Sequence, residues 1–522
     1  MCWFSLLALG VVFMSLVFTG CCAGVSLSSL DLTVMIFIIS SKKMMFLVLL
    51  MVIFMSIITY SSYYMADSNC YSYFMLLMSI FVVSMVGLVF SGGCMSVLIF
   101  WDLLGVSSFY LVLYYGNWDS CSGAMNTIMM NRIGDAGVFL VFSGIFINGG
   151  GLNSSEALIG LSLMFFMMSC LTKSAQVPFS SWLPKAMSAP TPVSALVHSS
   201  TLVTAGLFLM MSLSSVVYMV SFLNALFYLG LMTMAIAGLS AYFEVDVKKL
   251  VALSTLSQMG FCFMSMGSGL VFLSFVHIMS HAIFKSCLFM QVGYLMHSCS
   301  GQQDSRNYGF LGGGSVLVQF QVFIMLCCLC GMMFLSGGVS KEAILESMMC
   351  VSSNFVIIAM FFIVVMLTFL YSYRMMKFFY YSFAVSDLYA GDSVIFKISS
   401  LILVVLSLSF MSWLSSCFYV VVVKLLYVDF FSIFYLFVIG GGLCMVVIKG
   451  CYYGLKYKFM VDFMSKYFLY VNWNLVWNES MLGVSMIRFL DVVSVCSKWV
   501  LSLMGSAGLN IIILSIMIFI LL

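Results

Sequence analysis

The stretch "VHIMSHAIFK", residues 276–285, combines the two features that decide the fold of this chain. It is strongly apolar, yet its ionisable residues His277, His281 and Lys285 stand four positions apart. At 100° and about 1.5 Å per residue, this spacing places the three side chains on one helical face, roughly 6 Å apart along the axis. Such a face must be turned toward polar groups or water, because charge exposed to hydrocarbon is costly.

The composition of the whole chain is as apolar as this stretch. Of its 522 residues, 64% are hydrophobic and 7% are charged, and the mean hydropathy is +1.20. Apolar runs of about 17 to 25 residues follow one another from residue 3 to residue 449, and another closes the chain at Leu509–Leu522. These runs lack the alternation of a membrane barrel. We therefore predict an all-α polytopic membrane protein with about fifteen or sixteen transmembrane helices.

The charge and cysteine patterns exclude several functions. A net charge of +3, carried by scattered basic residues, gives no reason to expect a nucleic-acid partner. Most of the 18 cysteines lie in apolar runs, where a thiol behaves as a small hydrophobe. The "CCLC" stretch at 327–330 lacks a second cysteine pair or a partner histidine, so we predict no metal site. The start, "MCWFSLLALG", lacks the pattern of a removed signal and is interpreted as the first span.

Helix breakers gather at two places. All four prolines fall within "VPFSSWLPKAMSAPTPV", residues 177–193, directly after an apolar run that carries Lys173. In "LSGGVSKEAIL", residues 335–345, Gly337 and Gly338 precede Lys341. Paired interruptions of this kind indicate two inverted repeats with an ion path at their centre. Two ordinary loops remain the alternative.

Changes in hydropathy and charge density along the sequence divide the chain into six segments. Residues 452–507 hold eight charged side chains, with Lys458, Asp462 and Lys466 four apart, which favours a lateral amphipathic helix over another span. An ordinary matrix-facing loop is the alternative. We predict N-terminal transmembrane helices at 1–92, a first antiporter-like repeat at 93–240, a second at 241–380, further spans at 381–451, the lateral helix at 452–507 and a terminal span at 508–522.

Ionisable residues within the predicted spans form a series, and each is a functional candidate because its burial is costly. Histidine titrates near neutral pH, and a buried lysine beside a movable carboxylate can hold and release a proton. The series consists of Asp102, Arg132, Asp135, Lys173, His198, Lys248, His277, His281, Lys285, Lys341 and Glu342. We predict that it forms a proton or cation path.

Some of these residues have simpler explanations. Arg132 and Asp135, three apart, satisfy the spacing of an ordinary ion pair. Lys248 and its neighbour Lys249 lie near the start of a span, where a lysine can extend to the membrane surface. His198 follows the proline-rich break and can cap a helix end. Lys173, Lys285 and Lys341 lie in the middle of their segments, where a side chain has no route to the membrane surface.

The middle of the chain, about residues 100–375, resembles the antiporter-like subunits of mitochondrial NADH:ubiquinone oxidoreductase, respiratory complex I, and among them the subunit 5 branch. The stretches that carry the resemblance are "NRIGD" at 131–135, "KSAQVPFSSWLPKAMSAPTPVSALVHSST" at 173–201, "DVKKLVALSTLSQMG" at 246–260, "HIMSHAIFKSCLFM" at 277–290 and "QDSR" at 303–306. The histidine face, the "NRIGD" run and the amphipathic segment before the last span distinguish this branch from its sisters.

The resemblance implies a role for each residue of the series. Asp102 and Lys173 correspond to the carboxylate and lysine of the proton-input half, and His198 leads toward Lys248 at the centre. The face of His277, His281 and Lys285 then extends the central axis. Lys341 and Glu342 correspond to the output side. The family usually has glutamate in place of Asp102 and a proline in place of Met333.

The resemblance also implies that the chain carries protons while others carry electrons. We find no nucleotide-binding glycine pattern and no cysteine set with cluster spacing, so flavin, iron–sulfur clusters and quinone are expected in partner subunits. The expected partners are other complex I subunits, above all the neighbouring antiporter-like ones, and membrane lipids, in the mitochondrial inner membrane. Two alternatives stay open: a subunit of a bacterial multi-subunit cation/proton antiporter, whose large subunits usually continue beyond a point like Leu522, and a purely structural membrane subunit.

Overall fold

The computed structural model describes eleven stretches of the chain: residues 23–26, 36–66 and 68, 70–147, 156–212, 220–299, 301–305, 316–332, 335–351, 355–380 and 394–410. They all belong to a compact unit, Met1–Gly441, whereas the second unit, Gly442–Leu522, lies outside them. Long helices dominate the described part, together with one short antiparallel pair of strands, β1 (Ala23–Ser26) and β2 (Ile36–Ile39). The predicted helical membrane class is confirmed.

The N-terminal part is a group of long apolar helices. α2 (Ser41–Tyr64), α3 (Tyr71–Phe90) and α4 (Cys94–Leu113) are each long and apolar enough to cross a membrane. α5 (Trp118–Ile147) packs against α4 and against α6 (Glu156–Lys173). Because turns of a few residues join α2 to α3, α3 to α4 and α4 to α5, these helices run antiparallel to their neighbours in sequence.

The proline-rich window breaks the chain as predicted. α6 ends at Lys173, and the backbone then passes through the short helices α7 (Trp182–Lys185), η1 (Ala186–Ser188) and α8 (Thr191–Val193). The π-helical stretch η2 (Ser194–Thr201) and α9 (Leu202–Ser212) complete a second apolar segment, Thr191–Ser212. This segment is buried within the bundle, so its π-helical turn is surrounded by protein, whereas the break before it is exposed at Pro178, Ser181 and Lys185.

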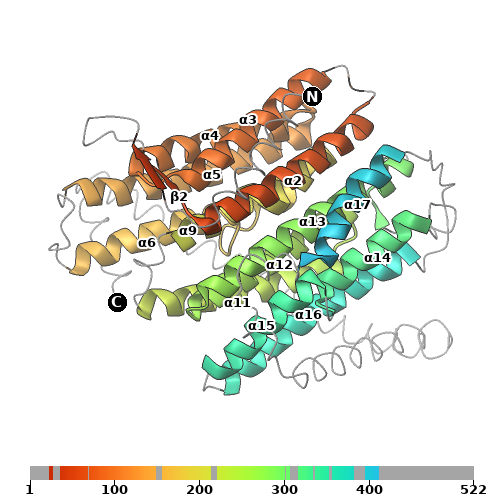
Figure 1. Ribbon diagram of the computed structural model, residues 1–522. Helices are drawn as coiled ribbons and strands as arrows, with labels where there is room; N and C mark the ends of the chain where they lie inside the picture. The colour runs from red at the N-terminus through yellow and green to blue at the C-terminus, as the bar shows by residue number, and fades with distance from the viewer. Residues whose placement is uncertain are drawn as a thin grey trace, which may run out of the picture. The chain divides into compact units, whose positions relative to one another are not determined.

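A long buried helix, α13 (Val271–Ser298), connects the two halves of the bundle. It packs against α2, η2 and α12 (Val247–Gly267) on the N-terminal side, and α12 in turn packs against α11 (Val220–Phe243). In Figure 1, α13 lies between α2 and α14 (Val316–Cys330). The helix that carries the His277 face is therefore covered by other helices along its length.

The second predicted break is present, but it precedes the two glycines. α14 ends at Cys330, and α15 (Ser336–Val351) begins before Gly337 and Gly338, which both lie in its first turn. A Cβ at Gly337 would stand 1.8 Å from the Cys328 carbonyl oxygen. The glycines therefore permit a close backbone approach between α14 and α15, whereas Gly331, with a φ of +88°, makes the turn itself.

Two further helices, α16 (Phe355–Tyr380) and α17 (Val394–Leu408), complete the described part. Seven helical segments in it meet the length and hydropathy of a membrane span, and four shorter apolar helices accompany them. The predicted lateral helix at 452–507, the terminal span and Met333 lie outside the described residues. The predicted segment boundaries at 92, 240 and 380 stay predictions.

Candidate functional site

Lys173 lies at the end of α6 and is fully buried. Its ammonium donates a hydrogen bond of 2.7 Å to the carbonyl oxygen of Trp101 and lies 4.3 Å from the centre of the Trp101 ring. Gly105, one turn further along α4, leaves room for it, since a Cβ there would stand 3.8 Å from Lys173 Nζ. The lysine thus fits against α4 through a carbonyl, an aromatic face and a glycine.

Asp102, the expected partner of Lys173, is paired instead with Arg132. The Arg132 guanidinium lies 3.3 Å from Asp102 and 3.3 Å from Asp135, so it bridges the two carboxylates. The side chains of Arg132 and Asp102 are 48% and 38% exposed, whereas that of Asp135 is 5% exposed. Arg132 and Asp135 thus have the ion-pair geometry that their spacing allows, Asp102 belongs to the same cluster, and a role of this cluster in the path stays a prediction.

Buried polar atoms surround this first lysine. Among the described residues, Asn131 has no hydrogen-bond partner for its side-chain oxygen or nitrogen, and neither do Asp135 Oδ1 and Trp101 Nε1. Buried polar groups of this kind are usually satisfied by ordered water. Water at such atoms would allow proton exchange between groups that do not touch.

His198 and Lys248 form the next step. His198 is buried in the π-helical stretch η2, where its ring lies 6.0 Å from that of Trp182 and neither nitrogen has a partner in the described part. π-helical turns often occur at functional sites. Lys248 of α12 is 4% exposed and donates a hydrogen bond to the carbonyl oxygen of Ala189 in the proline-rich break.

The adjacent lysine has a different environment. Lys249 is 43% exposed and pairs with Asp246 at 2.5 Å, so it is the interfacial lysine of the two. The partly exposed Lys249 thus fits the interpretation of an extended surface lysine better than the buried Lys248, whose place in the path stays a prediction.

His277 is the best-connected residue of the face on α13. Its Nδ1 lies 2.9 Å from Ser340 Oγ on α15, and its Nε2 lies 3.2 Å from Gln258 Oε1 on α12. Gln258 in turn donates a hydrogen bond of 2.9 Å to the hydroxyl of Tyr371 on α16. The imidazole therefore joins three helices through hydrogen bonds.

The remaining two residues of the face, His281 and Lys285, also lie inside the bundle. His281 and Lys285 are both fully buried. Lys285 donates a hydrogen bond of 2.5 Å to Ser254 Oγ on α12, whereas neither ring nitrogen of His281 has a partner in the described part. His281 thus provides an unoccupied donor and acceptor between the lysine and His277.

Lys341 and Glu342, expected to form one site, point to different neighbours. Lys341 donates a hydrogen bond of 2.5 Å to the carbonyl oxygen of Leu329, at the end of α14. Glu342 interacts electrostatically with Glu346, one turn along the same helix. Adjacent residues on a helix do not face each other, which explains the divergence.

Sequence reasoning missed the neutral residues that hold the series together. Trp101, Ser254, Gln258, Ser340 and Tyr371 each contact one of the buried ionisable residues or their direct partner. Their signal in the sequence is weak, because serine, glutamine and tyrosine are ordinary in transmembrane helices. Among the described residues, no group of three or more His, Cys, Asp or Glu side chains could hold a metal ion.

Broken helices with buried lysines beside the breaks define an antiporter-like helical membrane protein. The family model for the transmembrane part of NADH:quinone oxidoreductase and Mrp antiporters matches residues 91–368. NADH-ubiquinone oxidoreductase chain 5 of Ascaris suum is 44% identical over 89% of this chain and 85% of its own, and that of Caenorhabditis elegans is 45% identical over 82% and 81%. The chain belongs to the NADH-ubiquinone oxidoreductase chain 5 family.

A solved structure supports the fold independently. A chain of the Mrp complex from a Dietzia species superposes with a TM-score of 0.72 at 24% identity, covering 79% of this chain and 48% of that one. This chain therefore spans about half of that Mrp chain, and the likeness concerns the fold alone.

Proposed function

We propose that this chain is a membrane-arm subunit of a proton-pumping NADH:ubiquinone oxidoreductase and carries protons along the buried series. One observation carries the proposal: the four lysines of the series are buried, each donates to a neutral oxygen, and none has a carboxylate within ion-pair distance in the described part. They are Lys173, Lys248, Lys285 and Lys341, which bond to Trp101, Ala189, Ser254 and Leu329. A structural buried lysine is normally paired with a charge, because an unpaired one costs free energy.

The proposed order of the path is the one that the family resemblance implies, and one hydrogen bond between helices supports it. Protons enter near Lys173, where the polar groups of Asn131 and Asp135 hold water, and pass by way of His198 to Lys248. From there the path follows Lys285, His281 and His277 on α13. The hydrogen bond between His277 and Ser340 then leads to α15, which carries Lys341. Water completes the steps between side chains that do not touch.

The chain supplies no electron transfer in this scheme. NADH oxidation, flavin, iron–sulfur clusters and quinone reduction belong to partner subunits, and conformational coupling drives the protons. The mitochondrial inner membrane is the proposed location, since the chain 5 relatives come from animals. An identity of 44–45% to chain 5 proteins, against 24% to the Mrp chain, favours this function over that of a cation/proton antiporter.

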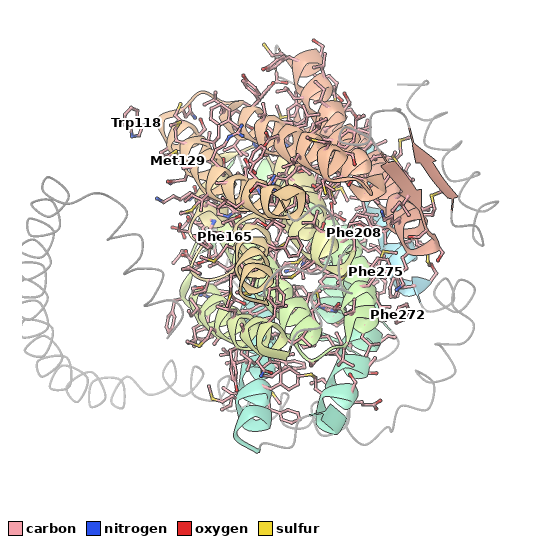
Figure 2. All side chains as sticks on the ribbon, turned by 90° about the vertical axis from the view of Figure 1, so that its left-hand side faces the viewer. Trp118, Met129, Phe165, Phe208, Phe272 and Phe275 are labelled. Carbon is pink, nitrogen blue, oxygen red and sulfur yellow. The ribbon has the colours of Figure 1, made fainter. Side chains whose placement is uncertain are left out.

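The outer face of α4 and α5 supports a neighbouring membrane subunit as partner. Arg132 and Asp102 are partly exposed there among apolar side chains such as Leu103, Met129 and Ile133. Figure 2 shows Met129 on the outside of the bundle, below Trp118. A charged pair facing lipid is costly, so a second antiporter-like subunit that covers it with polar groups is the partner that fits.

Replacement of Lys173 tests the function. A Lys173→Met complex is expected to assemble, oxidise NADH and pump fewer protons per NADH, since the proton holder is gone. Lys185→Met, on the exposed surface of α7, is the matched control. The measurement is proton translocation per NADH oxidised in reconstituted vesicles, with assembly followed on native gels. Full pumping by an assembled Lys173→Met complex contradicts the proposal, and loss of assembly with normal pumping in the surviving complex indicates a structural role.

A further inference from the structure

A cavity of about 530 Å³ lies where several helices end together, away from the proton series. It is lined by the start of α2, the turn between α3 and α4, and the end of α9, with Phe275 of α13. Figure 2 shows Phe208 and Phe275, both lining residues, on the side of the bundle away from Trp118. Because all these helices begin or end here, the cavity lies at one end of the membrane-spanning region.

The described part of the lining carries charge of one sign. Among the described lining residues, Lys42 and Lys43 are the only charged ones, and Ser41, Ser91 and Ser212 add hydroxyl groups. Lys43 is 9% exposed and donates one hydrogen bond of 3.2 Å, to the carbonyl oxygen of Ser91. An ammonium has three donors, so the others remain for a ligand. An anion beside this ammonium would offset much of the cost of burying its charge.

Backbone groups favour the same ligand. The first amides of α2, from Ser41 onward, and of α4, from Cys94 onward, have no acceptor within their own helices. Both helix starts line the cavity, and the positive ends of two helix dipoles therefore add to the two lysines.

The floor of the cavity distinguishes a lipid from a soluble anion. Leu88, Val97, Phe142, Phe208 and Phe275 make its lining apolar beneath the lysines. A free phosphate ion has no part that would contact such a floor, whereas a phospholipid has both a phosphate and acyl chains.

We propose that this cavity binds an anionic phospholipid, with its phosphate between Lys42, Lys43 and the two helix starts, and an acyl chain on the apolar floor. The phosphate supplies the negative charge that balances the two lysines. The lipid fills the space between the α2–α3–α4 end of the bundle and the helices α9 and α13. Its role is structural and separate from proton transfer.

Photo-crosslinking in the intact complex tests this site. The complex is reconstituted into phosphatidylcholine vesicles that contain phosphatidylglycerol with a diazirine on its acyl chain, and cross-linked peptides of this chain are mapped. We expect labelling within residues 88–97 and 208–212. Lys42→Gln with Lys43→Gln should reduce it by roughly tenfold or more, since each lysine near the surface contributes to anionic lipid binding. Lys42→Arg with Lys43→Arg should retain it, and Lys185→Gln should leave it unchanged.

Competition in the parent complex gives a second readout that does not depend on folding of the variants. Unlabelled phosphatidylglycerol should displace the probe, whereas phosphatidylcholine and inorganic phosphate should not. Equal labelling by a phosphatidylcholine probe, or undiminished labelling of the double glutamine variant, overturns the proposal. Displacement by inorganic phosphate overturns the lipid assignment and identifies a soluble anion site.

Discussion

His277 Nδ1 lies 2.9 Å from Ser340 Oγ, and Ser340 directly precedes Lys341 on α15. This hydrogen bond connects α13 to the helix that follows the second break. It is the described side-chain contact by which the histidine face reaches the segment of Lys341, and it defines the exit step of the proposed path.

We predict that Ser340→Ala lowers proton translocation per NADH while the complex assembles. The substitution removes the hydroxyl that bonds both His277 and Ser280, at a stability cost of roughly 1–3 kcal/mol for a buried group left without a partner. Ser265→Ala is the control, because the Ser265 hydroxyl bonds its own helix at Cys262. Equal pumping by both variants would remove Ser340 from the path.

The adjacent lysines of α12 provide a matched pair. Lys248→Met should strongly reduce pumping, since Lys248 is buried and bonds to the proline-rich break at Ala189. Lys249→Met should leave pumping nearly intact, because its partner is the partly exposed Asp246, and a surface ion pair contributes about 0–1 kcal/mol. Both are measured as protons per NADH in vesicles. A larger loss for Lys249→Met would contradict the assignment.

Arg132→Gln should impair assembly before it affects pumping. Arg132 bridges Asp102 and Asp135, and its removal leaves one partly exposed and one buried carboxylate without their cation. We expect less complex on native gels, and near-normal protons per NADH in what remains. Arg132→Lys, which keeps the charge, should recover most of the complex. If Arg132→Gln complex forms in normal amount but does not pump, the cluster belongs to the path itself.

Gly337→Ala should destabilise the second break. The added methyl group would meet the Cys328 carbonyl at 1.8 Å, and overpacking of this kind costs roughly 1–3 kcal/mol. Gly105→Ala is the control for the methyl group, because its nearest contact is at 3.8 Å. The readout is the thermal stability of the purified complex. A Gly337→Ala complex as stable as the parent would show that α14 and α15 can move apart.

The sequence by itself determined the class of the protein, because an apolar chain with few charges has no stable alternative to membrane helices. It also determined where the first break falls, since four prolines in one window cannot continue a helix. The four-residue spacing placed His277, His281 and Lys285 on one face for the same local reason, the geometry of the α-helix.

Only the tertiary structure decided which partners these residues have. The sequence suggested Asp102 for Lys173, but the Trp101 carbonyl accepts that hydrogen bond while Arg132 takes Asp102. It also could not show that Ser340 meets His277 across 63 positions. Such pairs depend on how separate helices pack, and packing is set by the shapes of whole helix surfaces, whereas periodicity reports only the local backbone.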